Sequence, residues 1–252
     1  MKIFLKIKYD GSAYGGYQVQ KNCQTIQKML NDAAHSLFGY ECDVTGCSRT
    51  DAGVHAECFC ATVSKKGETG LITSIPVEKI PLALNVRLPD DIAVFFAEWV
   101  DESFHARYGV KEKTYIYKIH NAPARDPFLR NRAWHVPKRF SDEAVAAADK
   151  AARLFCGRHD FTSYMAAGSK VTDAVRNVKS ASVTRCGDII TFTVTADGFL
   201  YNMVRIMCGT LVEVMEGARS AEDIPQVTAA ADRRAAGRTA PAHGLYLCDV
   251  KY

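Results

Sequence analysis

The segment that most constrains the fold of this chain runs from Phe199 to Met215, where almost every side chain is apolar. A helix that is hydrophobic on all sides is buried on all sides. A glycine just beyond the segment, Gly217, stands where helices commonly end. The sequence therefore predicts a helix in the interior of the protein.

Two charged residues interrupt this apolar segment, Arg205 near its start and Glu213 near its end. A buried guanidinium is costly unless it is paired and hydrogen-bonded, so Arg205 needs a carboxylate or a phosphate. Glu213 lies more than two helical turns away, too far for a direct contact. We expect Arg205 to pair with Asp51; the alternative is a solvent-exposed Arg205 at the helix end.

Asp51 lies within residues 46–56, which read Gly-Cys-Ser-Arg-Thr-Asp-Ala-Gly-Val-His-Ala. This polar turn separates two apolar, strand-like segments, with Arg49 shortly before the carboxylate and His55 shortly after it. A lone carboxylate among small residues suits an exposed nucleophile or base. The alternative is that Asp51 caps a helix and Gly53 shapes the loop, because Asp is a preferred cap.

The composition fits an ordinary globular protein. A chain of 252 residues has room for one or two domains, and 48% hydrophobic and 24% charged residues are typical of soluble proteins. The N-terminus runs directly into an alternating strand pattern, and no uninterrupted apolar run is long enough to span a membrane. We therefore expect a cytoplasmic protein that has no signal peptide and no membrane partner.

The cysteines and histidines do not indicate a metal site. The nine cysteines are scattered without a C-x-x-C pair, and the seven histidines lack H-E-x-x-H spacing. Reduced thiols in the core are the better interpretation. Neither a phosphate-binding P-loop nor a dinucleotide-binding fingerprint is present. We expect no metal and no cofactor.

A basic segment, residues 125–139, contains one acidic residue, Asp126. Its basic residues are Arg125, Arg130, Arg132, Lys138 and Arg139, and Phe128, Trp134, His135 and Phe140 lie among or beside them. Basic groups beside aromatic rings suit a nucleic-acid strand, through phosphate contacts and base stacking. The alternative is a solvated charged face. A second cluster contains Arg233, Arg234 and Arg238.

The hydrophobic periodicity predicts an α/β (α+β) fold. Strands are expected over 2–9, 41–47, 57–64, 92–100, 113–120, 175–183, 189–195 and 245–252. Helices are expected over 25–39, 76–84, 141–156 and after residue 221, in addition to the buried one. The best junction lies within residues 101–109, so we predict two domains, 1–104 with Asp51 and 105–252 with Tyr115 and the buried helix.

Seven short segments, in order along the chain, carry a resemblance to a known family. They are Tyr9–Gly11, Arg49–His55, Phe104–Arg107, Lys113–Tyr117, Asp160–Tyr164, Gly198–Arg205 and Thr239–Leu247. These segments are similar to those of the tRNA pseudouridine synthase A family, over essentially the whole chain. So many matches in the right order are very improbable by chance.

The resemblance implies a fold and an activity. The fold would be two ferredoxin-like, RRM-like lobes that share a continuous, mixed but mostly antiparallel sheet with a central basic cleft. The activity would be isomerisation of uridine to pseudouridine in the anticodon stem-loop of tRNA, at positions 38, 39 and 40, after base flipping. Family members act as homodimers and need no cofactor.

The resemblance also implies residue roles. Asp51 would be the nucleophile, Arg205 would keep it ionised, and Tyr115 would stack on the uracil. Substrate contacts would come from Arg49 and His55, and from Arg130 and Arg132 in the basic segment. Without the resemblance, an ordinary aromatic of a sheet face is the preferred interpretation of Tyr115. For His55, an equal alternative is that it caps or packs against the following helix.

Three other functions remain open at this stage. The chain would serve as a non-catalytic tRNA-binding or folding module if its acidic loop had no chemical role. It would be a synthase of the same family that acts on another RNA if its substrate differed. An Asp–His hydrolase would need a second carboxylate or a metal beside Asp51 and His55, and the sequence indicates neither.

Overall fold

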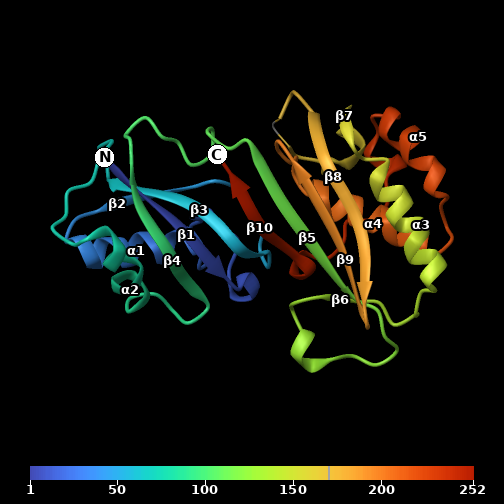
Figure 1. Cartoon of the computed structure of the whole chain (residues 1–252), viewed down its shortest axis with the longest axis horizontal. Helices are drawn as coiled ribbons and strands as arrows, with labels where there is room; N and C mark the ends of the chain where they lie inside the picture. Colours follow the sequence, from blue (N-terminus) through green and yellow to red (C-terminus); the bar gives the residue numbers. More distant parts are fainter. Residues whose placement is uncertain (170) are drawn as a thin grey trace. The chain divides into compact units, whose positions relative to one another are not determined.

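The computed structural model describes residues 1–169 and 171–252, which form ten β-strands and five α-helices (Figure 1). Contacts between residues divide the chain into two compact units. The first unit holds residues 1–111 and 247–252, and the second holds residues 112–246. The mixed α/β class predicted from the sequence is confirmed. The domain boundary after residue 104 stays a prediction.

The sheet of the first unit is built around β1 (Lys2–Tyr9). This strand pairs antiparallel with β3 (His55–Lys65) on one side and with β4 (Ile92–Val100) on the other. The short β2 (Cys42–Gly46) pairs with the far edge of β3. Alternate residues of β1 are fully buried, namely Ile3, Leu5 and Ile7. The period-two pattern therefore predicted this strand correctly.

Two helices complete the first unit, and α1 shows why the sequence predicted them. The Thr25 hydroxyl caps α1 (Ile26–Phe38) by accepting a hydrogen bond from the Lys28 amide at 3.3 Å. Gly39 ends the helix with a φ of 78°, a conformation that favours glycine. The helix packs against β2, whereas α2 (Ile80–Asn85) packs against β4.

The second unit contributes four antiparallel strands to the ten-stranded sheet. Its strand order is β5 (Glu112–His120), β9 (Ile189–Ala196), β8 (Val175–Cys186) and β7 (Gly157–Asp160). The two-residue β6 (Trp134–His135) pairs with β5 in parallel. β10 (Leu245–Lys251) begins in this unit and ends in the first.

The hairpin between β8 and β9 is tighter than predicted. The strands predicted over 175–183 and 189–195 leave residues 184–188 as their connection, but β8 continues to Cys186 and β9 starts at Ile189. Gly187, with a φ of 59°, and Asp188 form the whole connection. A two-residue loop with a left-handed glycine matches the twist of the paired strands, which explains the extra length of β8.

Three helices belong to the second unit. α3 (Asp142–Arg153) is capped by the Ser141 hydroxyl and packs against β8 and α4. α4 (Met203–Met215) also packs against β5, and α5 (Ile224–Ala229) follows it. Within residues 1–169 and 171–252, no helix has both the length and the hydrophobicity that crossing a membrane requires.

The buried helix predicted from the sequence is α4, in which every residue except Arg205 and Glu213 is buried. It begins at Met203 and not at Phe199 as expected, because Asn202 has a φ of 60° and cannot continue a right-handed helix. Gly209 lets another segment cross the helix closely, since a Cβ there would lie 1.7 Å from the Arg238 carbonyl oxygen.

Candidate active site

The Asp51 loop, residues 47–54, connects β2 to β3. A strand and not a helix follows it, so the alternative that Asp51 caps a helix is wrong. The Asp51 side chain is half-buried, and Arg49 is exposed two positions before it. The loop therefore presents a carboxylate and a guanidinium at the ends of two strands.

Hydrogen bonds fix the backbone on both sides of Asp51. Thr50 is buried, and its hydroxyl lies 2.8 Å from the Tyr9 hydroxyl at the end of β1. The Thr50 carbonyl accepts the Tyr17 amide at 3.0 Å, and the Asp51 carbonyl accepts the Val54 amide at 3.1 Å. Because these bonds involve the neighbouring backbone, they restrict the direction in which the Asp51 carboxylate can point.

Two glycines allow a second loop, residues 10–17, to lie directly against the Asp51 loop. A Cβ at Gly11 would come within 2.0 Å of the Val54 carbonyl oxygen. Gly16 has a φ of 95°, and a Cβ there would come within 2.6 Å of the Thr50 carbonyl oxygen. Only glycine permits such an approach, so these positions are part of the support for Asp51.

His55 contacts the residue 10–17 loop from the interior of the protein, where it is only 2% exposed. Its Nδ1 accepts a hydrogen bond from the Gly11 amide at 3.1 Å. The same nitrogen lies 3.1 Å from a carboxylate oxygen of Asp10. His55 is the first residue of β3, so the alternative that it caps or packs against a following helix is wrong. Its contact with RNA stays a prediction.

In the second unit, Tyr115 and Tyr117 lie on the same face of β5, as the sequence predicted. Tyr115 is 6% exposed and meets Phe199 edge to face, with ring centroids 5.0 Å apart. The Tyr117 hydroxyl donates to the Pro241 carbonyl at 2.7 Å. Burial raises the pKa of Tyr117, an effect that the nearby Arg205 guanidinium opposes.

Arg205 is held in the first turn of α4. Its Nη1 donates to the Asn202 side-chain oxygen at 2.6 Å, and its Nε donates to the Ala240 carbonyl at 2.8 Å. The Ala240 amide returns a bond to the Arg205 carbonyl at 3.1 Å. Glu213 instead pairs with Arg219 at 3.2 Å. The bonds to Asn202 and Ala240 therefore orient the guanidinium of Arg205.

The structure brings the predicted residues together in two groups. Arg49, Asp51 and His55 share one loop of the first unit, whereas Tyr115 and Arg205 belong to the second. The pairing of Asp51 with Arg205 joins two units and stays a prediction. Sequence reasoning missed the supporting roles of Tyr9, Thr50, Asn202 and Ala240, although each lies in a segment that carries the family resemblance.

Comparison with known proteins decides the family. A family model described as tRNA pseudouridine synthase matches residues 6–109 and 151–252. The chain belongs to this family. This tRNA pseudouridine synthase is therefore an isomerase that acts on tRNA, and the fold class predicted from the sequence is confirmed.

Individual members of the family are similar to this chain over nearly its full length. The tRNA pseudouridine synthase A of Ruminiclostridium cellulolyticum is 43% identical over 252 residues, which covers 100% of this chain and 99% of the relative. That of Acetivibrio thermocellus is 43% identical over 248 residues and covers 98% of each. That of Halalkalibacterium halodurans is 42% identical over 245 residues, or 97% of this chain and 90% of the relative.

Proposed function

We propose that this synthase converts uridine to pseudouridine in the anticodon stem-loop of tRNA, at positions 38, 39 and 40. The observation that carries the proposal is the Asp51 loop, in which a half-buried carboxylate stands on a backbone fixed from both sides. Accurate placement of a reacting group is what an isomerisation without an external reagent requires. The similarity to synthase A enzymes along the whole chain supports the choice of substrate.

In this proposal Asp51 is the nucleophile and attacks either the uracil ring or the ribose carbon. The N1–C1′ bond breaks, the ring rotates and a C5–C1′ bond forms. The proton lost from C5 is balanced by one gained at N1, so no redox partner or energy source is consumed. A cofactor is not needed for these steps.

Arg205 is the proposed partner that keeps the Asp51 carboxylate ionised, because an opposite charge nearby favours the charged form. The bonds to Asn202 and Ala240 support this role, since they orient the guanidinium before any substrate binds. An ionised carboxylate is the reactive form, so loss of the arginine would reduce the rate of the chemical step.

Tyr115 is the proposed platform for the uracil ring. Its contact with Phe199 sets the plane of the phenol, and a fixed ring loses little entropy when a base stacks on it. The hydroxyl of Tyr115 would assist loss of the C5 proton.

The target base lies in a stem-loop and must leave its stack before reaction, which costs a few kcal/mol. We propose that Arg49, exposed beside Asp51, holds the flipped nucleotide through its phosphate. Arg130 and Arg132, which are both exposed, would bind the RNA backbone further away. We also propose that the protein is cytoplasmic, as its sequence pattern indicates, and that it is a homodimer, as the family resemblance implies.

The direct test uses purified protein, an unmodified tRNA transcript and a chelator, without added cofactor. Pseudouridine is mapped by carbodiimide labelling and primer extension, with Asp51→Asn in parallel. We expect modification at positions 38–40, and its loss in Asp51→Asn while RNA affinity is kept. Turnover by Asp51→Asn would exclude Asp51 as the nucleophile. Tight binding without modification would favour the non-catalytic module, and modification of a different RNA would favour a synthase with another substrate.

A further inference from the structure

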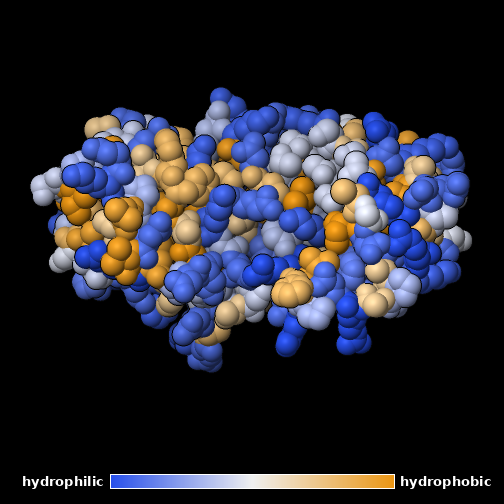
Figure 2. Space-filling view, turned by 60° about the horizontal axis from the view of Figure 1, so that its bottom comes forward, coloured by the Kyte–Doolittle hydropathy of each residue, from blue (hydrophilic) through white to orange (hydrophobic). Residues whose placement is uncertain are grey.

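The connection between β5 and α3, residues 121–140, forms what we call the Phe128 loop. Phe128 is 88% exposed, the highest value among the large hydrophobic side chains of residues 1–169 and 171–252. In Figure 2, which turns the lower side of Figure 1 forward, hydrophilic side chains surround small hydrophobic areas over this part of the second unit. A large exposed ring needs a reason, because most rings of this size are buried.

The exposure of Phe128 is built into the local backbone. Residues Pro127–Leu129 form a short 3-10 turn. The Asp126 carboxylate caps it by accepting the Phe128 amide at 2.8 Å, and the Asp126 carbonyl accepts the Leu129 amide at 3.1 Å. The Leu129 carbonyl then accepts the Arg132 amide at 2.9 Å. Phe128 is therefore held on an ordered turn at the tip of the loop.

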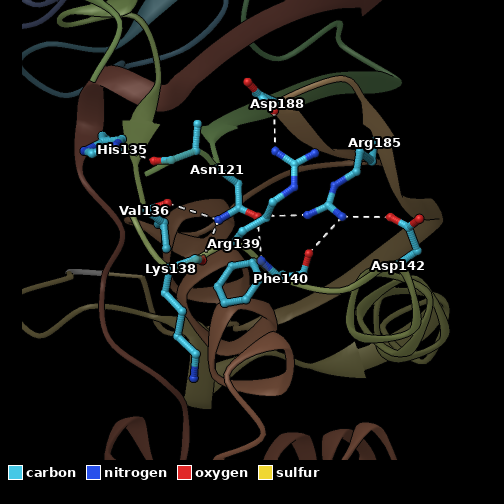
Figure 3. A network of polar contacts seen from close by, with 10 residues as sticks. Asn121, His135, Val136, Lys138, Arg139, Phe140, Asp142, Arg185 and Asp188 are labelled. Atoms are coloured by element: carbon cyan, nitrogen blue, oxygen red, sulfur yellow. Dashed lines mark hydrogen bonds and ion pairs between the residues drawn. The ribbon is translucent and has the colours of Figure 1, made fainter. Parts of the chain in front are cut away.

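One buried side chain, Asn121, closes the base of the Phe128 loop (Figure 3). Its amide group donates to the carbonyls of Val136 at 3.0 Å and Lys138 at 2.8 Å. Its oxygen accepts from the Phe140 amide at 2.9 Å and from the Arg185 guanidinium at 2.8 Å. These four bonds use both donors and both acceptor positions of the amide. Asn121 thus ties the first residue of the loop to three residues at its end.

The end of the β8–β9 hairpin reinforces this base. Arg185 also donates to the Phe140 carbonyl at 3.0 Å and to the Asp142 carboxylate at 2.8 Å (Figure 3). The main-chain carbonyl of Asp188 accepts a hydrogen bond from the main-chain amide of Asn121 at 2.7 Å. The Asp188 carboxylate forms an ion pair with the Arg139 guanidinium at 2.5 Å. The hairpin therefore holds both ends of the loop.

The charge around Phe128 is not balanced within the protein. Arg125 and Arg130 are exposed, and neither side chain makes a hydrogen bond or ion pair with another residue in the part of the chain that the structure describes. The acid between them in sequence, Asp126, already accepts the bond that caps the turn. An exposed ring beside unbalanced guanidinium groups matches a nucleic-acid strand, which offers bases to stack and phosphates to bind.

The same charge pattern argues against a second copy of this chain as the partner. In a two-fold interface the same patch meets itself, so the arginines of both copies would face one another. Like charges placed together across an interface are unfavourable. RNA is the partner that relieves this repulsion.

We propose that Phe128 stacks on an unpaired base of the bound tRNA and that Asn121 is a positioning residue that presents it. The inference rests on the proposed function, since tRNA is the substrate assigned there. It concerns a part of the chain that lies between the two ranges matched by the family model, 6–109 and 151–252. Asn121 holds the Phe128 loop in one conformation before RNA binds, and a preformed loop lowers the entropic cost of binding.

The test compares the dissociation constants of Phe128 variants for an unmodified tRNA transcript. All variants carry Asp51→Asn, so that turnover does not enter the measurement. Phe128→Ala is expected to weaken binding about tenfold, the effect of losing one stacked base. Phe128→Trp should bind like the parent, whereas Phe128→Leu should resemble Phe128→Ala. The slope of affinity against salt should not change, because no phosphate contact is lost.

A matched control removes an equally exposed apolar side chain elsewhere. Ile72 is 86% exposed in the first unit, and Ile72→Ala is expected to leave tRNA affinity unchanged. Sedimentation of each variant measures its oligomeric state. An unaltered dissociation constant in Phe128→Ala would overturn the proposal. So would an affinity loss that merely follows dissociation of a dimer, since the ring would then lie between copies of the chain.

The positioning role is tested with Asn121→Ala. We expect faster amide hydrogen exchange in residues 122–135 and an affinity loss like that of Phe128→Ala. The double variant should bind no more weakly than either single variant, because both changes remove the same stacking contact. Additive losses would show that Asn121 acts on binding by another route. If Asn121→Ala does not fold, the Phe128 series still decides the stacking proposal.

Failure of this inference differs from failure of the proposed function. A parent enzyme that makes no pseudouridine in tRNA would contradict the proposed function, whatever Phe128 does. An active enzyme whose affinity for tRNA does not depend on Phe128 would contradict only the present inference.

Discussion

The Asp51 loop and the Phe128 loop differ in where they are held. In the Asp51 loop, the bonds fall on the functional residue and its immediate neighbours, through Thr50 and two glycines that permit close contact. In the Phe128 loop, the strongest network lies at the base, around Asn121, and the tip is exposed. A nucleophile must be placed to within a fraction of an ångström, whereas a stacking ring must only be within reach of a base.

This difference predicts two kinds of kinetic effect. Changes near Asp51 should lower kcat, because they disturb the geometry of the chemical step. Changes in the Phe128 loop should raise KM and leave kcat nearly unchanged, because they disturb binding that is similar in the ground and transition states. Four variants test the comparison, in order of decreasing expected effect.

The largest effect is expected from Arg205→Met, which removes the proposed partner of Asp51. Turnover should fall on the order of 100-fold, the usual consequence of losing a preorganised charge beside the reacting group. The thermal midpoint should fall as well, since the bonds to Asn202 and Ala240 are lost. Arg219→Met is the matched control because Arg219 pairs with Glu213 of the same helix. It should lower the midpoint but keep kcat. An unchanged midpoint in Arg205→Met would argue against a buried pair.

The next effect is expected from Gly16→Ala, which forces a Cβ toward the Thr50 carbonyl oxygen. Such crowding costs about 1–3 kcal/mol of unfolding free energy, in addition to the strain at positive φ. Gly67→Ala isolates that strain, because Gly67 has a φ of 77° and nothing within 4 Å of the added atom. Gly16→Ala should lose more unfolding free energy, measured by urea denaturation, and more kcat than Gly67→Ala. Equal losses of unfolding free energy and of kcat in the two variants would show that the contact between Gly16 and the Asp51 loop is unimportant.

A smaller effect is expected from Tyr9→Phe, which removes the hydroxyl 2.8 Å from Thr50. Loss of one buried hydrogen bond costs about 1 kcal/mol, and kcat should fall several-fold while KM stays constant. Tyr40→Phe is the control, because the Tyr40 hydroxyl bonds to the Ile72 carbonyl at an exposed site. A rise in KM without a fall in kcat would contradict the role assigned to the Asp51 loop.

The smallest effect is expected from Arg130→Gln in the Phe128 loop. Removing one phosphate contact should reduce the salt slope of tRNA binding by about 1 and raise KM by a few-fold. Arg153→Gln provides the control, since Arg153 pairs with Asp149 one helical turn away on α3. An unaltered salt slope in Arg130→Gln would place the RNA on another surface.

Local sequence patterns were sufficient to predict many of the helices and strands. Thr25 and Gly39 predicted both ends of α1, because capping depends on residues at the helix termini themselves. The alternation of β1 predicted its bounds, and the apolar segment after Phe199 predicted the buried α4. The same local pattern could not locate the first residue of α4, since the left-handed backbone of Asn202 has no signature in hydrophobicity.

The sequence by itself determined the elements, the family resemblance and the choice of Asp51 as the candidate nucleophile. Only the tertiary structure decided what supports that residue, because Tyr9, Gly11 and Gly16 lie between 34 and 43 residues before the groups they touch in the Asp51 loop. It also decided that Asn121 closes the Phe128 loop with help from Arg185. Hydrophobic periodicity reports on residues a few positions apart, whereas these contacts depend on strand register and on loops that meet in space.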